Sequence, residues 1–97
     1  MMMETKSFYK GVRYQEVVEK NQQKGGDILE VTVQRKGAKE TAVIVTDYAD
    51  GLTVSTDTLV YEGEYLQSWT LAFGCKEPIP IFLRDEYEGI KREMAML

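Results

Sequence analysis

Residues Ile28 to Arg35 read Ile-Leu-Glu-Val-Thr-Val-Gln-Arg, and this stretch decides the fold class. Its apolar members alternate with polar ones, Leu29, Val31 and Val33 against Glu30, Thr32 and Gln34. A period of two is typical of a strand that is buried on one face only. The polar, glycine-containing segment 35–39 that follows has the length of a hairpin loop. The sequence therefore predicts a strand followed by a hairpin turn.

The segments after this hairpin extend it into an antiparallel meander. Asp50-Gly51 favours a tight hairpin turn because these residues tolerate positive φ angles, and Glu62-Gly63-Glu64 is a second turn. A further turn is expected near Asp57. The strands expected between these turns are Thr41–Tyr48, Leu52–Ser55, Thr58–Tyr61 and Tyr65–Phe73. The sequence thus predicts four or five antiparallel strands.

A helix is expected on each side of the strands. The first covers about Val12 to Gln23 and ends at Gly25-Gly26, because Tyr14, Val17, Val18 and Asn21 fall on one side at helical spacing. The second covers about Leu83 to Met96, with an apolar seam of Leu83, Tyr87, Ile90, Met94 and Leu97. We therefore predict one α+β domain over residues 1–97, in which an N-terminal and a C-terminal helix cover one face of the antiparallel meander.

The composition argues against most catalytic chemistry. The chain has no histidine, which removes the commonest general base and the commonest metal ligand. Its one cysteine, Cys75, allows neither an intrachain disulfide nor a zinc site. No glycine-rich phosphate loop is present. We therefore expect a protein that is not an enzyme and that holds no cofactor and no metal.

Two further features bear on where the protein works. No apolar run approaches the roughly 20 residues that a membrane span needs, and the first methionines are followed by Glu4 and Lys6 where a signal peptide would be apolar. A lone cysteine is typical of a reducing compartment. We expect a cytoplasmic protein that makes no membrane contact.

The charges are divided unevenly along the chain. Residues 1–40 hold eight Lys or Arg and six Asp or Glu, whereas residues 41–97 hold four and ten. Between Thr41 and Cys75, a segment called here the acidic stretch, there is no Lys or Arg at all. The net charge of −4 disfavours direct nucleic-acid binding, which needs clustered cations. The candidate partner-binding residues are the acidic residues and tyrosines of this stretch: Asp47, Tyr48, Asp50, Asp57, Tyr61, Glu62, Glu64 and Tyr65.

These residues favour a protein-binding function. We expect Asp50, Glu62 and Glu64 to be exposed in two turns at the same end of the sheet, where their charge would speed docking on a basic protein. Basic surfaces are common on proteins that handle nucleic acid. Small acidic inhibitors from phages and mobile elements, among them DNA mimics and anti-CRISPR proteins, share this size and charge.

Two alternatives stay open. The chain could be a self-associating structural subunit that uses an edge strand or its C-terminal helix, forming a homodimer through Leu83, Tyr87, Ile90 and Met94. It could also be a small enzyme or ligand-binding domain with a site that has no sequence motif.

Overall fold

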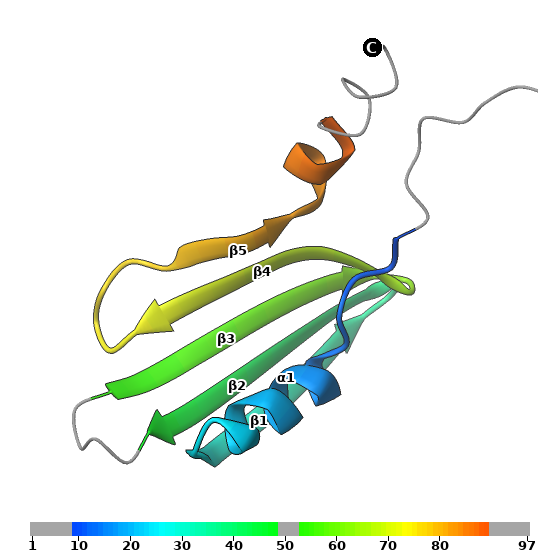
Figure 1. Cartoon of the computed structure of the whole chain (residues 1–97). Coiled ribbons are helices and arrows are strands. Elements are labelled where there is room, and N and C mark those ends of the chain that lie inside the picture. The colour runs from blue at the N-terminus through cyan, green and yellow to red at the C-terminus, as the bar shows by residue number, and fades with distance from the viewer. Residues whose placement is uncertain (1–8, 49–52, 90–97) are drawn as a thin grey trace, which may run out of the picture.

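A computed structural model describes residues 9–48 and 53–89. These residues form a five-stranded antiparallel sheet in the order β1-β2-β3-β4-β5, with one helix before it and a short helix over residues 84–89 after it. The elements are α1 (Tyr14–Gln23), β1 (Gly26–Lys36), β2 (Lys39–Tyr48), β3 (Thr53–Glu62), β4 (Tyr65–Phe73) and β5 (Ile79–Leu83). The predicted α+β class and the antiparallel meander are confirmed (Figure 1).

The strand β3 differs from its prediction. It is one continuous strand where the sequence predicts two short strands and a turn near Asp57. Its pairing with β2 runs without interruption from Lys39 opposite Glu62 to Tyr48 opposite Thr53. The physical reason is that Ser55 and Asp57 keep the alternation of Leu59 and Tyr61, so all four side chains face the core.

The core lies on the face of the sheet that carries α1. Its members are Val17 of α1 with Ile44, Leu59, Tyr61 and Leu66 of the sheet. The helix packs against β1 and β2 (Figure 1). Burying each of these side chains contributes about 1.5–3 kcal/mol to folding. This face is called here the helix face.

Glycines with positive φ angles lie after the end of α1 and in the segment that precedes it. Gly25 ends α1 with a φ of 89°, as the sequence predicts. At the other end, Gly11 has a φ of 86°, and a Cβ there would collide with the side chain of Leu66. The segment 9–13 therefore crosses close above β4, where the Leu66 N–H donates to the Lys10 carbonyl oxygen at 2.8 Å.

The segment after β5 packs back on the same face. The Tyr87 ring lies 5.4 Å from that of Tyr9 and 5.6 Å from that of Phe82. Arg84 is buried, and its Nε donates to the Leu66 carbonyl oxygen at 2.9 Å. The described helix covers residues 84–89 of the predicted Leu83–Met96, while Ile90 and Met94 lie outside the described residues. None of the described helices has the length and apolar character needed to cross a membrane.

Candidate functional site

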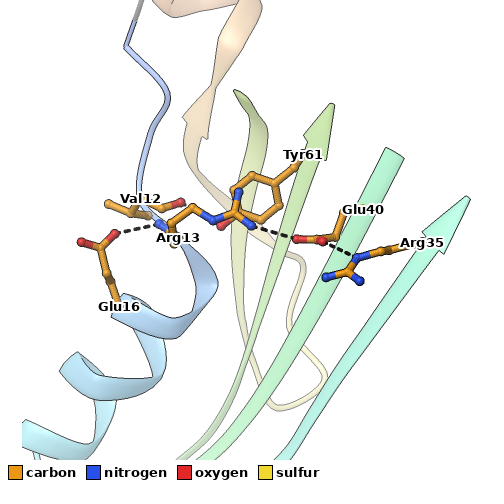
Figure 2. Close-up of polar contacts among 6 residues, drawn as sticks. All are labelled: Val12, Arg13, Glu16, Arg35, Glu40 and Tyr61. Atoms are coloured by element: carbon orange, nitrogen blue, oxygen red, sulfur yellow. Dashed lines mark hydrogen bonds and ion pairs between the residues drawn. The ribbon is translucent and has the colours of Figure 1, made fainter. Parts of the chain in front are cut away.

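The most connected polar cluster joins the start of α1 to the sheet (Figure 2). Arg13 Nη2 lies 3.1 Å from Glu40 Oε1, and Arg35 Nε lies 2.7 Å from Glu40 Oε2. The hydrogen bond from Arg35 keeps the pKa of Glu40 below its ordinary value, with further help from Arg13. The backbone N–H of Arg13 also donates to Glu16 Oε2 at 2.8 Å, which caps the helix. This cluster fixes α1 on the sheet.

Tyr61 lies beneath the same cluster. Its side chain is fully buried, its hydroxyl donates to the Val12 carbonyl oxygen at 2.8 Å, and the Arg13 guanidinium stacks 4.2 Å from its ring centre. Burial raises the pKa of Tyr61 to about 12. The expectation that Tyr61 contributes to a binding surface is wrong, because its position in β3 points it into the core.

Asp57 is also inside the fold, at only 3% exposure. Its Oδ2 accepts a hydrogen bond from Asn21 Nδ2 at 3.0 Å, and its Oδ1 accepts one from Trp69 Nε1 at 2.8 Å. Asn21 Nδ2 also donates to Thr46 Oγ1 at 3.0 Å. A buried carboxylate needs such donors in place of water. Asp57 therefore joins α1 to three strands, and the expectation that it is part of an acidic surface is wrong.

The remaining predicted residues are divided between two ends of the sheet. Because β3 is continuous, the connection between β2 and β3 lies at one end, and the Glu62–Glu64 turn lies at the other. The expectation that these turns share an end is wrong for that reason. Asp50 itself lies outside the described residues, but Tyr48 and Thr53, which flank residues 49–52, pair at the end away from Glu62.

Glu62, Glu64 and Tyr65 lie at the end that also carries the Figure 2 cluster, called here the paired end. Glu64 is exposed and forms an ion pair with Lys10 Nζ at 2.9 Å, and this contact lowers the pKa of Glu64. Glu62 is exposed opposite Lys39. The half-buried Tyr65 ring lies 5.6 Å from the guanidinium of Arg84. Cations therefore offset the acidic residues of this end.

The opposite end carries Asp27 and Asp47 and is called here the acidic end. The two residues are direct cross-strand partners in β1 and β2. Neither forms an ion pair with another residue of the described part. Like charges placed directly opposite each other destabilise a sheet. Tyr48 lies beside them on the helix face, where burial raises the pKa of its phenol and Asp57 adds to the effect.

The second face of the sheet has no described element packed on it and is called here the open face. Its residues alternate with the buried ones, and none of them is buried. Across the middle of β2, β3 and β4 they are small or β-branched and uncharged: Thr41, Val43, Val45, Thr56, Thr58, Val60, Ser68, Thr70 and Ala72. A solvated sheet face normally carries charged side chains. The acidic end supplies the charges along one border of this face.

Catalytic groups do not converge in the described part of the chain. No three potential metal-ligating side chains gather among residues 9–48 and 53–89. Cys75 is exposed in the turn after β4, without a disulfide partner. One hollow on the described surface is lined by Arg35, Lys36 and Lys39 with two polar neighbours.

Sequence reasoning missed the open face and the pair Asp27 and Asp47. The alternation of Thr and Val in β3 could have revealed the face once β3 was read as one strand. Comparison of the chain with models of known protein families, with curated proteins and with solved structures finds no match in any of the three.

Proposed function

We propose that this chain is a non-enzymatic protein-binding module that docks the open face of its sheet on a basic protein. The observation that carries the proposal is the uncharged centre of that face, which no described element covers. Protein interfaces typically have a centre depleted in charge and a polar rim. Val43, Val45 and Thr58 have this character in the middle of the sheet.

The negative charge of the acidic end indicates that the proposed partner carries a positive surface. Asp27 and Asp47 face each other at a cost in stability and have no cation from the described part of the chain. Lys24 and Lys76 lie in exposed turns near this end but form no ion pair with them. A basic surface brought against Asp47 would remove the repulsion and speed association.

The test uses the full chain, immobilised and exposed to an extract of its source cell, followed by measurements with the purified partner. Asp47→Lys is expected to slow association by about tenfold or more, because rim charges act on association rates. Thr58→Lys places a charge in the centre of the face and is expected to abolish binding. Binding should weaken toward 0.5 M salt, where screening shortens the reach of charges to about 4 Å.

Glu62→Lys is the matched control, since Glu62 is exposed at the paired end of the same face and should not matter for binding. All variants should keep the wild-type circular dichroism spectrum. Binding that survives Asp47→Lys, Thr58→Lys and high salt would show that the open face is only a solvated surface.

A further inference from the structure

The two edges of the sheet are unequal. At one edge, β5 has only five residues. It contains Pro80 and follows Pro78, and neither proline has the backbone N–H that strand pairing requires. At the other edge, β1 has eleven residues and no proline, and β2 is its only strand neighbour among the described residues. Native sheets usually protect such an edge with short strands, prolines, lysines, β-bulges or a covering element. Although β1 has a bulge near one end and Lys36 at the other, it is long and free of proline, so it is the edge better able to accept another strand.

The side chains of β1 also favour a pairing contact. Leu29 is 56% exposed and Val31 is 42% exposed. Apolar β-branched pairs across neighbouring strands contribute roughly 0.2–1 kcal/mol each to sheet stability. Val31 already lies opposite Ile44 of β2, and a strand along the outer side of β1 would give it a second cross-strand neighbour.

The charges at the two ends of β1 point to the identity of that strand. Within the chain, Asp27 lies opposite Asp47, and at the far end Lys36 lies opposite Lys39. Both ends of β1 therefore face a like charge. Neither Asp27 nor Lys36 has an ion pair within the described part of the chain. A strand that runs antiparallel with the opposite order of charges would satisfy both ends, and β1 itself is such a strand.

We propose that two copies of this chain pair through their β1 edges, antiparallel and with Thr32 on the two-fold axis. Val31 then lies opposite the partner subunit's Val33, and Asp27 lies opposite the partner subunit's Lys36. The proposal goes beyond the proposed function and does not rest on it, because it uses the edge of the sheet and not the open face.

The bulge in β1 makes this register consistent. The pairing with β2 shifts between Ile28 and Glu30, so that Leu29 is an extra residue and the side-chain alternation changes sign there. Without the shift, Asp27 and Lys36 would point to opposite faces of the joined sheet. With it, both lie on the open face, and Val31 and Val33 both lie on the helix face.

The first helix does not obstruct the pairing. It packs on the helix face of the sheet, against β1 and β2, so it does not occupy the side of β1 on which a second strand would form its hydrogen bonds. In the proposed dimer the two α1 helices would lie on the same face of the joined sheet.

The first experiment measures the mass of the full chain in solution by light scattering over a range of concentrations. The wild type is expected to be a dimer, and either Asp27→Lys or Lys36→Asp is expected to weaken dimerisation at least tenfold. The double variant that carries both changes restores opposite charges and should dimerise again. Glu62→Lys is the matched control, because Glu62 is exposed on β3, two strands away from the β1 edge, and it should stay dimeric.

The second experiment fixes the register, using Cys75→Ser as the background so that only one thiol is present. Thr32→Cys should form a disulfide-linked dimer under mild oxidation, because Thr32 faces its own copy across the axis. Thr58→Cys, in the middle of the sheet, should not. A wild type that stays monomeric, a swap that fails to restore the dimer, or the absence of the Thr32→Cys cross-link would each overturn the proposal. A variant that loses partner binding but still forms the dimer would bear on the proposed function of the open face and not on the dimer.

Discussion

The two ends of the sheet handle charge in opposite ways. At the paired end, Glu40 lies between two guanidinium groups, and Glu64 lies 2.9 Å from Lys10 Nζ. At the acidic end, Asp27 lies directly opposite Asp47 with no described cation on either. Glu40 and Glu64 of the paired end thus have cations within the chain, whereas Asp27 and Asp47 of the acidic end have none among the described residues.

The largest effect on stability is expected from Asp57, a member of the acidic stretch that lies in the core. Asp57→Ala should lower the free energy of unfolding by about 2–4 kcal/mol, because it leaves the buried donors of Asn21 and Trp69 without their acceptor. Asp47→Ala, in the same stretch, should change it by less than about 0.5 kcal/mol. Denaturant unfolding followed by tryptophan fluorescence measures both values. Equal costs for the two variants would contradict the assignment of Asp57 to the core.

Glu40→Gln tests whether the paired end is held by its charges. The expected loss is about 1–2 kcal/mol, since one carboxylate serves both Arg13 and the largely exposed Arg35. The folded pKa of Glu40 lies below the unfolded value of 4.5, so its contribution is complete above pH 4.5 and disappears as the pH falls through the folded pKa.

The stability difference between the wild type and Glu40→Gln should therefore vanish in acid. Glu62→Gln, an exposed neighbour at the same end, should show no difference at any pH. A constant difference across the acid range would mean that Glu40 acts through packing alone.

Tyr61→Phe should have a smaller effect, of about 1 kcal/mol, from loss of the hydrogen bond to the Val12 carbonyl oxygen. Burial raises the folded pKa of Tyr61 from 10.0 to about 12. Between these values the unfolded phenol ionises while the folded one stays neutral, so stability falls as the pH rises. Tyr61→Phe should lose less stability over this range than the wild type does. Tyr65→Phe, whose ring is only half-buried, is the control.

Local patterns in the sequence were enough to predict much of the fold. The alternation in residues 28–35 predicts β1, the glycine pair predicts the end of α1, and the turn residues predict the hairpins of the meander. These features depend on neighbours in the chain, which a sequence displays directly. The β1 bulge at Leu29 depends on pairing with β2, and no residue near it indicates that the register of this pairing shifts.

The candidate site was harder to predict because it depends on partners distant in sequence. A carboxylate at position 57 looks like a turn or surface residue until Asn21 and Trp69 are known to supply donors. Tyr61 looks like an interface residue until Val12 and Arg13 are known to lie against it. Both errors treated polar groups as solvated, whereas this fold satisfies them internally on its helix face.

The smallest effect on stability is expected from Asp47 at the acidic end. Asp47→Asn removes one of two like charges that face each other, so it should raise the free energy of unfolding by about 0.2–0.5 kcal/mol at low salt. The gain should disappear in 0.5 M salt, because the repulsion acts between side chains that solvent reaches. Glu64→Gln at the paired end should instead be neutral or slightly destabilising, since it removes the ion pair with Lys10. Effects of opposite sign for Asp47 and Glu64 are expected because Asp47 faces a like charge and Glu64 faces a cation, and effects of equal sign would contradict that electrostatic difference between the two ends.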